Sequence, residues 1–271
     1  MHQQYISIAK QESGVKKSIK KLLGKLGYQV LRRHASQVGL VSIHAVTGKS
    51  RTYRFASDMP CDGVQKYHVN GEFYEAKELE MIRSIFRPGV FVDVGANVGN
   101  HSIYMAGVPA CERVVAVEPN PRALRLLRLN LGLNDLESRV TVIAAAFSDS
   151  EAEFTMRTPT NNLGGTTIMP AARGNQPAEE VGKCHSVIGS EALRGINVSF
   201  IKIDVEAHEM EVLRGLREVI ATQRPDVFIE VSREDRRNVE CFFIDLGYSI
   251  GEPVPPDEPL VTLMFIANAS G

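Results

Sequence analysis

Strand and helix patterns alternate along residues 90–267, and this alternation predicts an α/β fold with a doubly wound, mostly parallel sheet. Short apolar runs at residues 90–94, 114–118 and 199–204 have the composition of buried parallel strands. The ending differs, because the residues near Ser249 and residues 260–267 read as two strands with no helix between them. An open sheet of this kind binds ligands outside the carboxyl ends of its strands.

The chain before the sheet contains a basic amphipathic helix at residues 15–26. Its apolar residues fall on one helical face and lysines cover the rest. Such a helix packs on a core or a partner subunit, or it attaches to an anionic membrane surface. We expect packing, with peripheral membrane contact through residues 15–26 as the alternative.

A β-hairpin follows the helix, since residues 38–46 and 51–56 alternate in polarity across Thr47-Gly48-Lys49. We place the helix and the hairpin in an N-terminal extension, residues 1–69. Residues 76–86 have helical spacing, and Arg87-Pro88-Gly89 ends that helix directly before the first strand of the sheet. The second domain therefore spans residues 70–271.

A glycine-spaced turn follows the first strand of the sheet, in Phe91-Val92-Asp93-Val94-Gly95-Ala96-Asn97-Val98-Gly99-Asn100. Gly95 and Gly99 let the backbone turn sharply and approach a ligand at the start of a helix. A dinucleotide fingerprint would need glycine at Asn97 and Asn100, so a nicotinamide or flavin site is disfavoured. The spacing suits a compact amino-acid carboxylate, such as that of S-adenosylmethionine. Alternatively, the glycines serve only tight strand–helix packing.

Acidic and polar side chains follow the later strands. Glu118 ends the second strand, where a carboxylate can accept hydrogen bonds from both ribose hydroxyls. A helix at residues 122–133 and a strand at residues 140–144 come next. Further residues after strand ends are Ser148, Asp149, Asp204, Glu206 and Glu230.

Three motifs together resemble the FkbM family of S-adenosylmethionine-dependent methyltransferases. They are residues 91–100, Val117-Glu118-Pro119-Asn120-Pro121, and residues 201–215 with the sequence IKIDVEAHEMEVLRG. The resemblance implies a seven-stranded, Rossmann-like class I fold with an antiparallel last strand, and S-adenosyl-L-methionine as methyl donor to a hydroxyl. Two positions depart from the family pattern, which has Gly at Ala207 and a small or apolar residue at His208.

The motifs and the family likeness together place the donor and acceptor residues. The cofactor-binding residues are Asp93, Gly95, Ala96, Asn97, Gly99, Asn100, Glu118, Pro119, Ser148 and Asp149. By analogy with the family, Ser148 and Asp149 flank the adenine, although Asp149 could equally be a turn residue.

The candidate catalytic residues are Asp204, Glu206, His208 and Glu230, any of which could take a proton from the acceptor. A helix over residues 207–221 would place Glu206 and His208 around its first turn, facing the cleft, with Glu209 and Glu211 in solvent. The same cluster permits a divalent metal as a secondary hypothesis, since no definite ligand spacing is present.

The composition is that of an ordinary enzyme. Hydrophobic residues make up 44% of the 271 positions, and the formal net charge of −1 gives no global attraction to nucleic acid. Four widely spaced cysteines without a C-x-x-C pair argue against a zinc site and for a reducing compartment. The first apolar stretch is interrupted by lysines, so no signal peptide is indicated and we expect a cytoplasmic protein.

Residues 157–185 are rich in Gly and Pro and read as a long loop, either a lid or a surface excursion. Asn161, Asn162, Thr166 and Thr167 in this segment could bind sugar hydroxyls, and Arg157 or Arg173 could bind a phosphate or carboxylate of the acceptor. The sequence thus predicts an O-methyltransferase for a small-molecule or glycan acceptor, a hydroxyl of a saccharide or secondary metabolite. The alternatives are an N- or aromatic O-methyltransferase, which the low aromatic count disfavours, and a catalytically silent cofactor-binding module.

Overall fold

The computed structural model describes residues 5–7, 29–31, 41–49, 51–159, 162–169, 178–251 and 260–267. The chain divides into two compact units, Met1–Ser42 and Ile43–Gly271. In the first unit, β1 (Tyr5–Ser7) pairs in parallel with β2 (Gln29–Leu31). The expected amphipathic helix at residues 15–26 lies outside the described residues. The boundary between residues 69 and 70 stays a prediction.

The second unit begins with the hairpin that the sequence predicts. Strands β3 (Ser42–Thr47) and β4 (Thr52–Ser57) form a two-stranded sheet, and the Gly48 N–H donates to the Arg51 carbonyl at 3.0 Å in the turn. Two helices then lead to the main sheet, α2 (Gln65–Val69) and α3 (Ala76–Ile85). The predicted hairpin and the predicted helix before the first strand are both confirmed.

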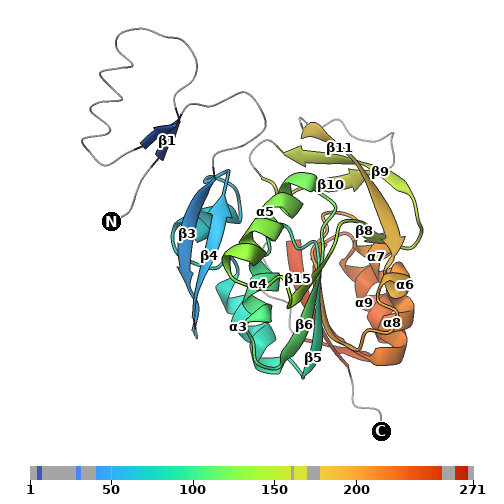
Figure 1. Cartoon of the computed structure of the whole chain (residues 1–271). Helices are drawn as coiled ribbons and strands as arrows, with labels where there is room; N and C mark the ends of the chain where they lie inside the picture. The colour runs from blue at the N-terminus through green and yellow to red at the C-terminus, as the bar shows by residue number, and fades with distance from the viewer. Residues whose placement is uncertain are drawn as a thin grey trace. The chain divides into compact units, whose positions relative to one another are not determined.

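A seven-stranded sheet forms the centre of the second unit (Figure 1). Its strand order is β14-β15-β13-β12-β5-β6-β7; β15 is antiparallel to both of its neighbours, and the other pairs are parallel. The predicted doubly wound, mostly parallel sheet with an antiparallel last strand is confirmed. The strands are β5 (Gly89–Val94), β6 (Cys111–Val117), β7 (Val140–Ile143), β12 (Val198–Ile203), β13 (Asp226–Ser232), β14 (Tyr248–Ile250) and β15 (Leu260–Ala267).

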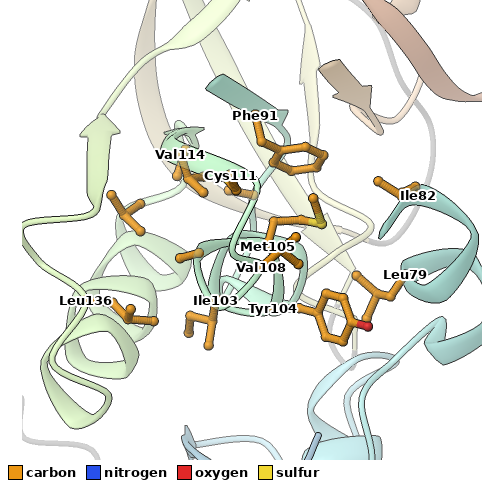
Figure 2. Close-up of a cluster of buried hydrophobic side chains, with 14 of the residues drawn as sticks. Leu79, Ile82, Phe91, Ile103, Tyr104, Met105, Val108, Cys111, Val114 and Leu136 are labelled. Atoms are coloured by element: carbon orange, nitrogen blue, oxygen red, sulfur yellow. The ribbon is translucent and has the colours of Figure 1, made fainter. Parts of the chain in front are cut away.

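Helices cover both faces of this sheet (Figure 1) because the central strands are apolar on both sides. On β5, Phe91 packs in one core with α3 and α4 (Figure 2), whereas Val90 and Val92 pack in the other core with the C-terminal helices. The helices are α4 (Asn100–Ala106), α5 (Pro121–Leu133), α6 (Gly189–Ala192), α7 (Glu209–Gly215), α8 (Arg217–Gln223) and α9 (Arg236–Asp245).

Asn120 begins α5, because its side-chain oxygen accepts from the Arg122 N–H at 2.9 Å and Pro121 occupies the first turn. The single helix expected at residues 207–221 is instead two helices, α7 and α8, that meet at Leu216. Among the helices that the structure describes, none combines the length and apolar character needed to cross a bilayer.

The segment expected to be a long loop at residues 157–185 contains, where the structure describes it, the end of β9, all of β10 and most of β11, so that prediction is wrong for these residues. Asn161 and Arg173 lie outside the described residues. The three strands belong to a four-stranded sheet with the order β10-β9-β11-β8, and β9 pairs antiparallel with both neighbours. Cross-strand pairing and the buried Met156 and Cys184 stabilise these strands despite weak sequence periodicity. The strands are β8 (Ala146–Ser148), β9 (Glu153–Pro159), β10 (Thr167–Met169) and β11 (Ala178–Ile188).

Candidate active site

A cavity of about 350 Å³ opens at the carboxyl ends of β5, β6, β12 and β13. This is the edge of a parallel sheet at which ligands are expected. The strand ends contribute the residues Val94, Gly95, Asn97, Val117, Glu118, Pro119, Asp204, Val205, Glu206, His208 and Glu230. Further walls come from the segment before α3 and from the loop that leads to β10, with Tyr67, Tyr74, Asn162, Gly164 and Thr166 among them.

The turn after β5 has the backbone conformation that its glycine predicts. Gly95 has a φ of +81°, and Asn97, which tolerates the left-handed region, has a φ of +48°. A Cβ on Gly95 would lie 1.8 Å from the Asp204 carbonyl oxygen, and one on Gly99 would lie 2.6 Å from Leu127 Cδ1. The Asp204 backbone therefore requires glycine at position 95, which also lines the cavity, whereas at Gly99 the φ of +92° is the main reason for glycine.

Glu118 joins the two motifs that follow β5 and β6. Its Oε2 accepts from the Asn97 N–H at 2.8 Å, and its Oε1 accepts from the Asn120 N–H at 2.7 Å. Burial raises the pKa of this carboxyl to about 7, and the two backbone hydrogen bonds oppose that shift. The acid thus holds both turns in place, and each oxygen keeps a further lone pair for a ligand.

The residues at this end of the cavity fit the adenosyl donor that the motifs suggest. Glu118 is placed to receive ribose hydroxyls, and the Oδ1 atom of Asn97 is buried with no hydrogen bond among the described residues. Four of the predicted donor residues line the cavity, Gly95, Asn97, Glu118 and Pro119. Six others do not: Asp93, Ala96, Gly99, Asn100, Ser148 and Asp149.

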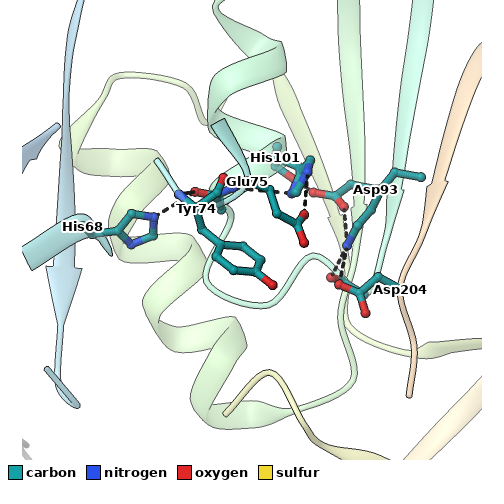
Figure 3. A network of polar contacts seen from close by, with 10 residues as sticks. His68, Tyr74, Glu75, Asp93, His101 and Asp204 are labelled. Carbon is teal, nitrogen blue, oxygen red and sulfur yellow. Dashed lines mark hydrogen bonds and ion pairs between the residues drawn. The ribbon is translucent and has the colours of Figure 1, made fainter. Parts of the chain in front are cut away.

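Asp93 is fully buried and belongs to a polar network (Figure 3). Its Oδ2 accepts from the Ser102 hydroxyl at 2.6 Å, and its Oδ1 lies 3.7 Å from Lys202 Nζ. Lys202 also donates to Asp204 Oδ2 at 3.1 Å and to the Gly95 carbonyl at 3.3 Å. Lys202 is 3% exposed, so this cation directly connects the donor turn to the acidic end of the cavity.

Asn100, at the start of α4, holds the chain segment that precedes α3. Its Nδ2 donates to the Tyr74 carbonyl at 2.9 Å, and its Oδ1 accepts from the Tyr74 N–H at 3.1 Å. The same Oδ1 lies 2.9 Å from His68 Nε2. Asn100 therefore fixes Tyr74 on the cavity wall, a role that residue spacing did not reveal.

Three of the predicted catalytic acids, Asp204, Glu206 and Glu230, line the same end of the cavity. Burial, followed by repulsion from Asp204, raises the pKa of Glu206 to about 7 and that of Glu230 to about 8. Glu206 has a φ of +50°, and the next residue, Ala207, has a φ of +66°. Carboxyls with pKa values near neutrality suit proton transfer in a water-poor site.

The predicted start of the helix after β12 is wrong by two residues. Ala207 is left-handed and α7 begins at Glu209, so His208 occupies the cap position. The carboxylate of Glu209 turns back to accept from the Ala207 N–H at 2.9 Å. Glu209 is consequently buried, not in solvent as expected, whereas the Glu211 side chain is 37% exposed and pairs with Arg214.

His208 lines the cavity with its ring held on both sides. Its Nε2 lies 3.0 Å from the Ser148 hydroxyl, and its Nδ1 lies 3.7 Å from a Glu211 oxygen. Burial lowers the pKa of the imidazole. Asp149, for which the sequence left open an adenine contact or a turn role, accepts from Arg214 Nε at 2.8 Å, and this pairing lowers its pKa.

A second cavity of about 640 Å³ adjoins the first beneath β9 and β10. Both cavities are lined by Ile168, Glu206 and His208. The apolar part of its wall comes from residues such as Phe154, Pro159, Ile168 and Met169. The described residues contain no group of three or more His, Cys, Asp or Glu side chains arranged to hold a metal ion.

The order of the seven strands and the site at their carboxyl edge define a class I methyltransferase fold. A model of the methyltransferase FkbM domain matches residues 93–250, more than half of the chain. The chain belongs to this family of S-adenosylmethionine-dependent methyltransferases. The family therefore implies S-adenosylmethionine as the methyl donor.

Two named relatives and one solved structure illustrate the likeness. Methyltransferase sdnD of Sordaria araneosa is 26% identical over 189 residues, which cover 59% of this chain and 73% of that protein. AMB antimetabolite synthetase AmbE of Pseudomonas aeruginosa is 30% identical over 186 residues, 55% of this chain but 8% of the synthetase. The structure of methyltransferase FkbM from Methylobacillus flagellatus is 18% identical, with a TM-score of 0.47, and covers 96% of this chain and 73% of that one.

Sequence reasoning missed several residues of the site. Lys202 lies inside the third motif, and its position two residues before Asp204 on one strand face could have indicated the ion pair. Tyr67 and Tyr74 carried no such signal, because long-range hydrogen bonds from α4 bring their segment to the cavity.

Proposed function

We propose that this protein is an S-adenosylmethionine-dependent O-methyltransferase whose acceptor is a hydroxyl of a saccharide or another secondary metabolite. One observation carries the proposal: the ribose-type acid Glu118 and the acids Asp204, Glu206 and Glu230 line a single cavity. A donor held at the first acid would have its reactive end directed toward the other three. S-adenosylmethionine supplies a methyl group bonded to a positively charged sulfur.

The donor end of the cavity serves to bind and orient. With the donor bound, Glu118 would accept hydrogen bonds from the ribose hydroxyls, and the Gly95–Asn97 turn would hold the amino-acid part of the donor. Methyl transfer needs little covalent help, so the main contribution of the protein is to hold the acceptor oxygen in line with the methyl carbon.

The acceptor end combines carboxylates with two aromatic rings. Tyr67 and Tyr74 line the cavity with ring centroids 5.3 Å apart and ring planes at 61°. Carboxylates accept hydrogen bonds from hydroxyl groups, and an aromatic ring offers an apolar surface to the C–H face of a sugar. This combination supports a polyhydroxylated acceptor, and the apolar second cavity leaves room for an attached hydrophobic group.

The excess of acid favours one alternative acceptor. Lys202 pairs with Asp204 at this end of the cavity. Glu206 and Glu230 add two further carboxyl groups, for which the described residues contain no ion pair. An amine would be attracted as its ammonium form and would need to lose a proton before methylation. An N-methyltransferase is therefore the second candidate, and amino sugars distinguish the two.

The test has two stages. Calorimetric titration with S-adenosylhomocysteine, with NAD as the control, should show micromolar binding of the former alone. The protein and S-adenosylmethionine are then incubated with methyl glycosides of glucose, mannose and rhamnose and with glucosamine, and S-adenosylhomocysteine release is measured. Release with the neutral glycosides supports O-methylation, and release with glucosamine alone supports the amine alternative. Binding without release from a wider acceptor panel would indicate a silent cofactor-binding module.

A further inference from the structure

A short segment before β10, residues 162–166, lines the donor end of the first cavity. Four of its five residues belong to the cavity wall, and Leu163 among them is 2% exposed. A Cβ on Gly164 would lie 3.1 Å from Asn97 Nδ2, so the segment lies close against the turn after β5. The segment therefore has a part in the donor site that its distance in the sequence from the motifs does not reveal.

Asp62, just before α2, anchors one side of this segment. The carboxylate is fully buried, and its Oδ2 accepts from the Leu163 N–H at 2.6 Å. Its Oδ1 accepts from the N–H groups of Val64 and Gln65, both at 3.0 Å. Hydrogen bonds from backbone N–H groups to a carboxylate are stronger than those between neutral groups. Asp62 thus fixes the backbone of Leu163 to a second part of the cavity wall.

Asn120 anchors the other side of the segment. Its Nδ2 donates to Thr166 Oγ1 at 2.9 Å and to Thr158 Oγ1 at 3.3 Å. The Thr166 hydroxyl donates to the Leu163 carbonyl at 2.7 Å and lies 2.8 Å from Thr158 Oγ1, so its proton and both lone pairs are used within the protein. Because the Asn120 N–H donates to Glu118, one asparagine connects the ribose-type acid to the segment.

The order of the strands indicates where the adenine of the donor would lie. Along the carboxyl edge of the main sheet β12, β5, β6 and β7 follow one another, so Glu118 lies between Asp204 and the chain that follows β7. A donor with its ribose at Glu118 and its sulfur toward Asp204 has its base on the β7 side. The cavity wall on that side is apolar, and its residues are Pro119, Ala146, Phe147, Leu163 and Ile168. Such a wall suits the flat ring system of adenine.

We propose that Leu163 covers the adenine of the donor and that Asp62 is the positioning residue that holds Leu163 there. The inference rests on the proposed S-adenosylmethionine-dependent function and deepens only its donor site. The ligand class is an adenine nucleoside, and the contact is apolar, with no bond made or broken. Leu163 takes the place expected for Ser148 and Asp149, which do not line the first cavity.

Calorimetry compares Leu163→Ala with Leu129→Ala, a matched change at a leucine of α5 that is 38% exposed and lines neither cavity. In Leu163→Ala the Kd values of S-adenosylhomocysteine and of adenosine should both rise about tenfold, because the lost contact is to the nucleoside that the two ligands share. Leu163→Met keeps the volume and should stay within threefold of wild type. Leu129→Ala should match the wild type. Affinities within threefold of wild type in Leu163→Ala, or a loss for S-adenosylhomocysteine alone, would overturn the adenine contact.

A double-mutant cycle tests the positioning role of Asp62. Asp62→Asn replaces the oxygen that faces the Leu163 N–H with an amide nitrogen or an oxygen of lower charge, and S-adenosylhomocysteine should bind about tenfold more weakly. Added to Leu163→Ala, it should weaken binding less than threefold further, since it acts through Leu163. A full tenfold further loss would overturn the positioning role. Asp245→Asn, at the exposed last residue of α9, is the control and should bind as the wild type does.

Photolabelling locates the adenine in the unaltered protein, so it does not depend on how well a variant folds. The probes are S-adenosylhomocysteine with an azido group at adenine C2 or C8, and trypsin releases residues 158–173 as one peptide after Arg157 and Arg173. We expect at least one probe to label residues 162–166, and excess unmodified S-adenosylhomocysteine to prevent the labelling. Absence of such label with both probes would overturn the inference.

These measurements need no acceptor, so the two proposals fail separately. If the wild type binds S-adenosylhomocysteine but methylates no acceptor, the proposed function fails while labelling at residues 162–166 still supports the adenine contact. If the wild type methylates a glycoside but the label falls elsewhere, only the inference about Leu163 is overturned. A wild type that binds no S-adenosylhomocysteine would overturn both.

Discussion

The two ends of the cavity are built in different ways. At the donor end, Glu118 fixes two backbone N–H groups, and the glycine turn is packed against the Asp204 carbonyl. At the acceptor end, Asp204, Glu206 and Glu230 lie near the buried cation Lys202. The donor end is a rigid cradle of hydrogen bonds, whereas the acceptor end is an accumulation of like charge.

This difference follows from the tasks of the two ends. A cradle with satisfied hydrogen bonds recognises one molecule that every turnover uses, and nothing there has to change its charge. Burial, and then repulsion between neighbouring carboxylates, raises the pKa values of these acids, which costs stability but supplies groups able to exchange a proton near pH 7. The acceptor end is thus the less stable and the more reactive of the two.

The largest effect is expected at the cation that both ends share. Lys202→Met would leave Asp93 and Asp204 without their counter-charge, and we expect a loss of about 3–5 kcal/mol in the free energy of unfolding. Urea denaturation measures this loss. Adding Asp93→Asn should recover part of it, since the fully buried carboxylate is then neutral. A double variant no more stable than the single one would contradict the coupling.

At the donor end, Glu118→Ala should weaken S-adenosylhomocysteine binding about 100-fold. The reason is that the variant loses the ribose acceptor and frees the N–H groups of Asn97 and Asn120. Calorimetry measures the affinity, and the thermal midpoint shows whether the fold persists. Glu112→Ala, at an exposed position of the same strand β6, is the control. Unchanged affinity in Glu118→Ala would remove the ribose assignment.

At the acceptor end, stability should depend on pH. The folded-state pKa values of Glu206 and Glu230, about 7 and about 8, lie above the ordinary 4.5, so the folded protein binds more protons than the unfolded chain between these values. The contribution of these two groups to the free energy of unfolding should therefore be largest at and below about pH 4.5. It should fall as the pH rises to about 8. Urea denaturation at a series of pH values measures this dependence, and the Glu206→Gln and Glu230→Gln variants should each lose less stability with rising pH than the wild type. A variant whose stability falls with pH in parallel with the wild type would contradict the raised pKa of that residue.

The smallest effect is expected for Asp149→Asn. Asp149 is paired with Arg214 and does not line the first cavity, so S-adenosylhomocysteine affinity should stay within about twofold of wild type. Calorimetry under the same conditions as for Glu118→Ala checks this. A loss of tenfold or more would instead place Asp149 on the adenine, as its position after the third strand first suggested.

The donor end could be predicted from the sequence because its determinants are local. Continuous apolar runs gave the strands, and Gly95 and Glu118 each follow a strand directly, so their place at the sheet edge needs no tertiary information. Asn120 and Pro121 likewise mark the start of α5. The candidate acids Asp204, Glu206 and Glu230 were found by the same rule, and the structure brings all three into one cavity.

The remaining features depend on contacts between distant segments. Tyr74 lies on the cavity wall, where Asn100 holds its backbone by two hydrogen bonds across the fold. The segment that contains β10 and β11 was read as a loop because of its many glycines and prolines. Pairing of β11 with β8 and β9 stabilises the strand, and the segment's own sequence does not reveal that pairing. Glu209 was misplaced because two left-handed residues delay the helix and rotate its faces.

The double hydrogen bond of Glu118 has a consequence for how the donor site behaves without a ligand. Because Asn97 and Asn120 already donate their amide hydrogens to this carboxylate, the two loops do not have to become ordered when the donor arrives. Binding there should release little heat from loop folding, and deuterium should exchange slowly at both amides before and after ligand is added.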